Sequence, residues 1–282
     1  MAYVLVLTAV TAVWGWTFVV IKDSIAHYPV APFLALRFGL AVLVLLLISR
    51  RLPQRRSLLI GGLIGATVAA GYALQTYGLQ STAPGTAGLI TGLFVVFTPV
   101  IDRFFGVRIH QRTAIAVGVA LLGTALLAGG DPTAQVGIGD LLVFGSAIAF
   151  AFQVVLLARH SAGLRATDLA LLQMAVSFVV FSAAGSTSFS APSGGVWFGV
   201  VITGVFASAL AFWIQAWVQA KMSATRAALI MAMEPAWALF FAVLLAGQHL
   251  NLVQAVGALL VLAAVVGHEA APQLAAARRS PA

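Results

Sequence analysis

The stretch "LIMAMEPAWALFF" (229–241) is apolar from end to end except for one acid, Glu234, which is followed directly by Pro235. It lies within a run of apolar residues long enough to cross a ~30 Å hydrocarbon core as a helix. An ionised acid at the centre of such a helix costs about 2.5–3.5 kcal/mol, and a proline breaks the backbone hydrogen bonding of the helix. The acid must therefore face a cavity, find a partner or be protonated.

Comparable apolar runs occupy nearly all of the 282 residues, which are 62% hydrophobic and 8% charged. Soluble domains contain about 25% charged residues. The runs are continuous rather than alternating, which excludes a strand barrel. We predict an all-α integral membrane protein with ten transmembrane helices, whose cores cover 2–21, 31–49, 58–79, 85–104, 113–129, 138–158, 168–186, 195–219, 227–246 and 251–269. Residues 271–282 are interpreted as a tail.

Positive charge lies on alternate connections between these runs. Thirteen of the fifteen Lys and Arg residues fall in the loops after the second, fourth, sixth and eighth runs and in the C-terminal tail. Cytoplasmic loops carry the excess of Lys and Arg in membrane proteins. We therefore predict that both termini are cytoplasmic. The net charge of +8 reflects this topology and does not indicate a nucleic-acid partner.

The sequence also contains an internal repeat, in which the first half is similar to the second. At a shift of 140 residues, "LQTYGLQSTAPGTAGLI" (74–90) aligns with "IQAWVQAKMSATRAALI" (214–230). At a shift of 136, "GWTFVV" (15–20) aligns with "AFQVVL" (151–156), and Thr98-Pro99 aligns with Glu234-Pro235. Two units of five spans follow, 1–130 and 131–270, and an odd number of spans inverts the second unit. Inverted repeats are typical of secondary transporters, whose substrate site lies near the midplane between the repeats.

Pro99 and Pro235 interrupt corresponding spans in this alignment, and matched helix breaks are the best sequence pointer to a transport site. A plain kink is the alternative for either proline alone. Glu234 has two interpretations that the sequence does not separate. It either contacts a ligand ammonium or carries a proton, or it is a neutral carboxyl bonded to carbonyls freed by Pro235.

Arg37 is the other charge within a span. It can snorkel outward to the membrane surface, pair with an acid or bind a carboxylate. We favour snorkelling or a structural anchor.

Aromatic residues accompany polar ones at equivalent depths in the spans of the two halves. Such a mixture suits a small amphipathic solute, because rings stack on its body while amides and hydroxyls bind its polar groups. The candidate substrate-binding residues are Trp16, Thr17, Tyr72, Gln75, Thr91, Phe94, Thr98, Gln153, Trp213, Gln215 and Glu234.

Other function classes lack their signatures. There is no GxSxG, Walker A or HExxH motif, and the five His residues lie in loops or at span ends. We therefore expect no enzyme activity, no metal and no cofactor. A channel-like facilitative pore remains an alternative, although no filter-like loop or charged ring is evident. A membrane enzyme acting on lipid-linked substrates is a weaker one.

Several segments are similar to those of a known family. "WGWTFVVIK" (14–22), "LALRFGLAVLVLL" (34–46), "GTAGLITGLFVVFTPVI" (85–101) and "ATRAALIMAMEPAWALFF" (224–241) resemble the EamA-type branch of the drug/metabolite transporter superfamily, and within it the YddG-type amino-acid exporters. The resemblance covers essentially the whole chain. The chain departs from the family pattern at Gln248-His249-Leu250, where an acid usually precedes the leucine.

The resemblance implies ten helices around a cavity lined by spans one, three, four, six, eight and nine. It also implies export of amino acids, aromatic ones included, and of other metabolites or organic cations. Together with the residues themselves, it leads us to expect an inner-membrane secondary transporter of a bacterium that works by alternating access. The oligomeric state, coupling ion and substrate are left open.

Overall fold

The computed structural model describes residues 2–127, 137–247, 249 and 251–277. Every regular element in this part of the chain is a helix. The first half contains α1 (Ala2–His27), α2 (Val30–Ser49), α3 (Arg55–Leu79), α4 (Pro84–Thr91), α5 (Phe94–Phe104) and α6 (Gln111–Leu127). The second half contains α7 (Ile138–His160), α8 (Ala166–Ala184), α9 (Gly194–Val201), the π-helix η1 (Ile202–Leu210), α10 (Ala211–Gln219), α11 (Ala224–Met231), α12 (Glu234–Ala246) and α13 (Leu252–Ala277).

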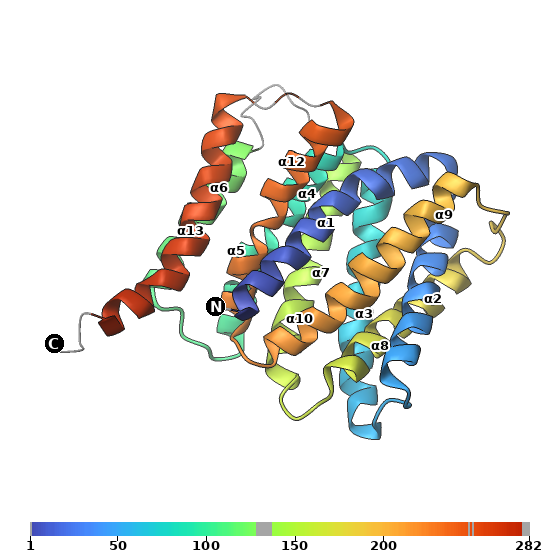
Figure 1. Cartoon of the computed structure of the whole chain (residues 1–282), viewed down its shortest axis with the longest axis horizontal. Coiled ribbons are helices and arrows are strands. Elements are labelled where there is room, and N and C mark those ends of the chain that lie inside the picture. Colours follow the sequence, from blue (N-terminus) through green and yellow to red (C-terminus); the bar gives the residue numbers. More distant parts are fainter. Residues whose placement is uncertain (1, 128–136, 248, 250, 278–282) are drawn as a thin grey trace.

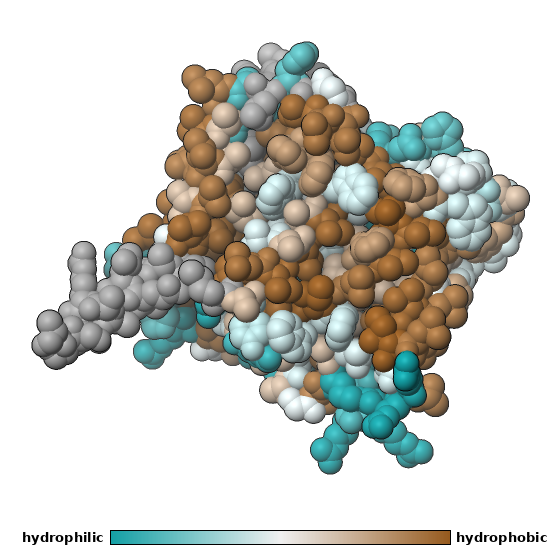
Figure 2. Space-filling view, viewed as in Figure 1, coloured by the Kyte–Doolittle hydropathy of each residue, from teal (hydrophilic) through white to brown (hydrophobic). Residues whose placement is uncertain are grey.

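These helices confirm the prediction of an all-α protein with ten apolar spans. Eight continuous or broken helices within the described residues are long and apolar enough to cross a membrane, and Gln111–Leu126 and Leu252–His268 are shorter apolar helices. α13 continues to Ala277, so the segment interpreted as a tail begins as helix. In Figure 2 apolar side chains cover the middle of the visible face, and hydrophilic ones gather at its ends.

The helices form one bundle in which α6 and α13 pack side by side at its edge (Figure 1). The N-terminal end of α1 and the basic loops that follow α2, α5, α7 and α10 lie toward the lower end of Figure 1. This arrangement is the one that the charge pattern requires. The side of the membrane that each end faces is still a prediction.

The topology can be measured by thiol labelling, because the chain contains no cysteine. Gln80 and Ser190 follow α3 and α8, whereas Gln54 and Arg108 lie in basic loops, and all four are exposed. In intact cells, Cys at Gln80 or Ser190 is expected to react with an impermeant maleimide. Cys at Gln54 or Arg108 is expected to react only after the cells are opened. The reverse pattern would contradict the predicted orientation.

Two spans are broken at corresponding places. α4 ends at Thr91 and α5 begins at Phe94, while α11 ends at Met231 and α12 begins at Glu234, so both breaks are offset by 140 residues. At each break the backbone makes short i→i−3 hydrogen bonds, including Leu93 N–H to Ile90 O (3.1 Å) and Met233 N–H to Ile230 O (3.2 Å). Both breaks therefore consist of a single tight turn.

This geometry corrects part of the sequence alignment. Pro235 lies at the start of α12, as predicted, but Pro99 lies inside α5, and the first-half break falls at Gly92 and Leu93 instead. The counterpart of Glu234 is thus Phe94 rather than Thr98. The two alignments differ by four residues, about one helical turn, so apolar sequences match almost as well in either register.

Glycines let the broken spans approach each other closely. A Cβ built on Gly88 would lie 2.6 Å from the Cβ of Ala238, and one built on Gly92 would overlap the ring of Pro235. A Cβ on Gly15 of α1 would lie 2.6 Å from the Cβ of Trp237. Close backbone approach through small residues is how membrane helices pack. Here it joins α1, α4 and α12 beside the two breaks.

Candidate functional site

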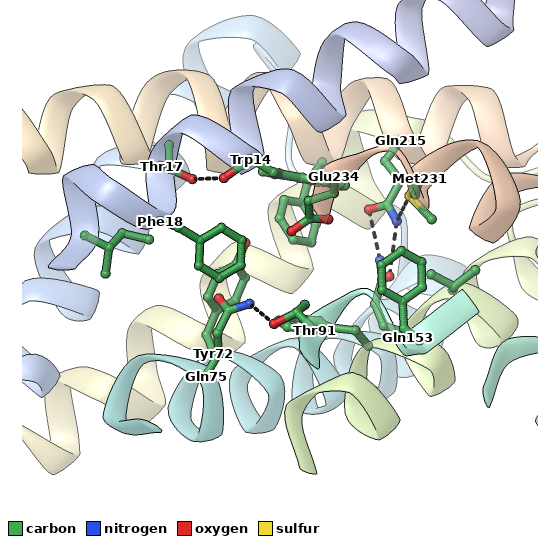
Figure 3. A pocket seen from close by; sticks show the side chains of 15 residues that line it. Trp14, Thr17, Phe18, Tyr72, Gln75, Thr91, Gln153, Gln215, Met231 and Glu234 are labelled. Atoms are coloured by element: carbon green, nitrogen blue, oxygen red, sulfur yellow. Dashed lines mark hydrogen bonds between the residues drawn. The ribbon is translucent and has the colours of Figure 1, made fainter. Parts of the chain in front are cut away.

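A cavity lies between the two halves of the bundle (Figure 3). Its walls come from α1, α3, α4, α5 and the second-half helices α7, α10, α11 and α12. These are spans one, three, four, six, eight and nine, the set that the resemblance implies. The lining residues are Trp14, Thr17, Phe18, Ile21, Tyr72, Gln75, Thr91, Phe94, Phe150, Gln153, Val154, Phe212, Gln215, Met231 and Glu234.

One face of α1 supplies four of these side chains, Trp14, Thr17, Phe18 and Ile21. Their spacing of three and four residues places them on one side of the helix. The indole Nε1 of Trp14 donates a hydrogen bond of 2.8 Å to the carbonyl of Ala207, which lies in η1. A π-helix is rare and usually local to a functional site. Here the π-helix provides the carbonyl of Ala207, which accepts this hydrogen bond and holds the Trp14 ring against the cavity.

Amide side chains form a second wall. Gln153 and Gln215 exchange two hydrogen bonds of 3.2 Å each, and Gln153 also donates to Gln173 Oε1 at 2.9 Å. On the opposite side, Gln75 Nε2 donates to Thr91 Oγ1 at 3.1 Å (Figure 3). All five side chains are buried. These hydrogen bonds hold the amide groups in place, because a buried amide without a partner would lose its hydrogen bonds to water and gain none in return.

Glu234 is the acid of the cavity. It is the first residue of α12 and only 6% of its surface is exposed. Among the described residues, none forms an ion pair with its carboxyl group or makes a hydrogen bond with it, either as donor or as acceptor. The structure therefore provides no support for a carboxyl bonded to freed carbonyls. The N-terminal end of a helix does favour a negative charge, since the unpaired N–H groups there carry partial positive charge. Glu234 thus presents its carboxyl group to the cavity from the N-terminal end of α12.

The structure brings together eight of the eleven predicted residues: Thr17, Tyr72, Gln75, Thr91, Phe94, Gln153, Gln215 and Glu234. Trp16, Thr98 and Trp213 do not line the cavity. Trp16 packs against Phe241, with ring centroids 6.4 Å apart, and Thr98 donates to the carbonyl of Phe94 at 2.7 Å. Trp16 and Trp213 lie on other sides of their helices from the cavity-lining residues, whereas Thr98 lies on the same side of α5 as Phe94 but one turn further along.

The sequence prediction missed the neighbours that do face the cavity, which are Trp14, Phe18, Ile21, Phe150, Val154, Phe212 and Met231. Helical spacing carried the signal: Phe150 precedes Gln153 by three residues, and Phe212 precedes Gln215 by three. Side chains three apart share a helix face, whereas adjacent ones do not. Starting from each glutamine and stepping by three would have selected Phe212 in place of Trp213.

Arg37 does not snorkel, because its side chain is completely buried. Its Nε donates to Ser208 Oγ at 2.8 Å, and its guanidinium carbon lies 4.4 Å from the centre of the Tyr72 ring. Nη1 and Nη2 have no hydrogen-bond partner within the described part of the chain. The prediction that Arg37 snorkels is therefore wrong, whereas a structural anchor stays a prediction.

No metal centre is evident in the part of the chain that the structure describes, where no three His, Cys, Asp or Glu side chains come together.

Ten apolar helices around a central cavity with polar and aromatic walls define a multi-pass membrane protein of the transporter class. The chain matches the EamA-like transporter family over residues 1–129 and again over residues 137–268, and it belongs to that family. Membrane transport is the activity that the family and its relatives share by name.

The relatives cover nearly the whole chain. An "Uncharacterized transporter" of Archaeoglobus fulgidus is 29% identical over 264 residues, which cover 92% of this chain and 83% of that protein. The "Uncharacterized inner membrane transporter YedA" of Escherichia coli K12 is 25% identical over 92% of this chain and 88% of its own length. "Uncharacterized transporter YyaM" of Bacillus subtilis is 26% identical over 89% of this chain and 88% of its own length.

A solved structure titled "Crystal structure of protein" superposes with a TM-score of 0.78 at 17% identity, covering 95% of this chain and 98% of that one. At this identity the likeness shows the fold alone.

Proposed function

We propose that this protein is a secondary transporter of the bacterial inner membrane, with both termini in the cytoplasm, that exports amino acids and related small amphipathic metabolites by alternating access. The observation that carries the proposal is the cavity, which combines aromatic walls, paired amides and one buried acid. Rings suit the apolar body of such a solute, while amides and a carboxylate suit its polar head. Two tight helix breaks, each one or two residues from a lining side chain, supply places where the spans can bend.

We further propose that residues 1–130 and 131–270 are inverted repeats. The breaks in the fourth and ninth spans support this division, because they recur at the same offset of 140 residues. A cavity between two such repeats can open to either side when one repeat rocks against the other.

A channel-like pore is the second candidate, and transport assays separate the two. Purified protein is reconstituted into liposomes loaded with unlabelled L-phenylalanine, and entry of labelled phenylalanine is followed. A transporter with alternating access is expected to show saturable counterflow that accumulates label transiently. A pore would equilibrate the label without saturation or accumulation. Lack of entry for phenylalanine and for a panel of other amino acids and amphipathic amines would contradict the proposed substrate class.

Two phenylalanines on α7 provide a matched test of the cavity. Phe150 lines it, whereas Phe152 is 40% exposed on another side of the same helix. We expect Phe150→Leu to raise the phenylalanine concentration that half-saturates counterflow about five- to tenfold, since a lost ring contact is worth about 1 kcal/mol. Phe152→Leu is expected to transport like the parent. A larger effect at Phe152 than at Phe150 would place the binding site elsewhere.

A further inference from the structure

We infer that Arg37 is the anion-binding half of the cavity and that, together with Glu234, it selects zwitterionic solutes that carry both a carboxylate and an ammonium group. The inference rests on the proposed function and specifies its substrate class. It is drawn from the burial, the missing partners and the position of these two charged side chains.

Arg37 carries a positive charge in a buried position. The side chain is fully buried, yet only its Nε has a hydrogen-bond partner, the hydroxyl of Ser208. Nη1 and Nη2 are buried with none among the described residues. A guanidinium stays protonated in proteins, so its charge persists. Removing an arginine charge from water without an opposing charge is costly, and buried cations are therefore normally paired.

None of the acids whose side chains the structure describes forms an ion pair with Arg37. Asp102 forms an ion pair of 2.9 Å with Arg159, and Asp168 forms one of 2.9 Å with Arg165. Asp140 accepts hydrogen bonds from Thr82 and from a backbone N–H, while the side chain of Asp23 is exposed at the end of α1. Of the acids whose side chains the structure describes, this leaves Glu234 as the buried one without an ion pair or hydrogen-bond donor.

Tyr72 contacts Arg37 and also lines the cavity. Its ring lies against the guanidinium at 4.4 Å, and the same side chain lines the cavity that contains Glu234. The ring of Phe38 also contacts Arg37, with its centre 5.2 Å from the guanidinium carbon. Tyr72 thus covers Arg37 on the side of the cavity. A displacement of this one ring would present Nη1 and Nη2 to a bound solute.

The two side chains have opposite chemistry. A guanidinium and a carboxyl group beside a single cavity complement a solute that carries one carboxylate and one ammonium group. The planar guanidinium can donate two parallel hydrogen bonds to a carboxylate, and the Glu234 carboxylate can accept from an ammonium group. The aromatic walls between them would then hold the side chain of the solute.

Competition between chemically matched solutes tests this assignment in the wild-type protein. Counterflow of labelled L-phenylalanine into proteoliposomes is inhibited with unlabelled L-phenylalanine, with L-phenylalaninamide, which lacks the carboxylate, and with 3-phenylpropionate, which lacks the ammonium. Phenylalanine is expected to compete at least about tenfold better than either analogue, because each analogue leaves one buried charge unpaired. Equal competition by phenylalanine and phenylalaninamide would overturn the inference.

Variants separate recognition from structure. In Arg37→Gln, phenylalanine is expected to lose about tenfold in potency and become equal to phenylalaninamide, whose own potency stays unchanged. A purely structural arginine would weaken all three competitors together, and that result would also overturn the inference. Arg51→Gln, which removes the same group from an exposed loop position, is the control and is expected to match the parent. If Arg37→Gln does not fold, Arg37→Lys is used instead, because it keeps the charge but lacks the planar guanidinium. It is expected to reduce the difference in potency between phenylalanine and phenylalaninamide.

The same measurements distinguish a failure of the proposed transport function from a failure of the role proposed for Arg37. If the wild type transports phenylalanine and its amide without preference, the proposed transport function stands and the role of Arg37 is wrong. If no amino acid or amphipathic amine shows counterflow, both are wrong.

Discussion

Replacement of Glu234 by glutamine is expected to reduce transport at least about tenfold while leaving the protein folded. Gln keeps the size and hydrogen-bonding capacity of the side chain but removes the negative charge. The carboxyl group lines the cavity and has no hydrogen-bond or ion-pair partner in the described structure, so the free energy of unfolding is expected to change little. A contact between a charged group and an ammonium is worth about 1.5–3 kcal/mol, which corresponds to a loss of about ten- to 150-fold.

Two assays on Glu234→Gln distinguish its roles. If the carboxylate carries a proton, uptake driven by a proton gradient is lost while counterflow, which needs no net proton movement, persists. If it binds the solute ammonium, both are reduced, and 3-phenylpropionate competes as well as phenylalanine for the counterflow that remains. Asp23→Asn removes an exposed carboxylate at the end of α1 and is the control. Parental activity of Glu234→Gln in both assays at every pH would show that the carboxyl takes no part in transport.

Gly92→Ala is expected to produce the largest loss of stability among single methyl additions near the helix breaks. The backbone at Gly92 is ordinary right-handed helix, so the effect is steric: the new methyl group would overlap the ring of Pro235. Overpacking of this kind costs about 1–3 kcal/mol. The cost arises where the two broken spans meet, so we expect a lower thermal unfolding temperature in detergent and slower counterflow.

Gly62→Ala is the matched control, because nothing lies within 4 Å of a Cβ built there on α3. Alanine in place of glycine in a helix interior is expected to be neutral or stabilising by about 0.5–1 kcal/mol. If Gly92→Ala unfolds at the same temperature as Gly62→Ala, the two breaks do not pack as closely as the structure indicates.

The helical fold was accessible from the sequence because the membrane imposes a simple rule. Backbone polar groups in lipid must be satisfied within the segment itself, so each long apolar run forms a helix. Runs such as 31–49 and 58–79 therefore matched α2 and α3 closely. The acid at Glu234 was also recognisable as a site residue, because charge is costly in such a run whatever its surroundings.

The cavity could be predicted only in part, for reasons of helix rotation. Gln153 and Gln215 were identified because polar residues avoid lipid, but aromatic residues are tolerated on either side of a membrane helix. Trp14 and Trp16 are the same residue type in the same apolar run, yet Trp14 faces the cavity and Trp16 packs against Phe241. Two residues along a helix correspond to a rotation of about 200°, so an error of this size selects the wrong face.

By itself, the sequence determined the number and approximate limits of the spans, their alternating charge and the presence of an acid at a helix break, since each depends on local composition and the solvent around it. The tertiary structure alone decided that the first-half break lies at Gly92 rather than Pro99. It also decided that Phe94 is the counterpart of Glu234 and that Arg37 is buried against Tyr72. These features depend on which helix faces meet and at what depth, and contacts between distant spans set that geometry.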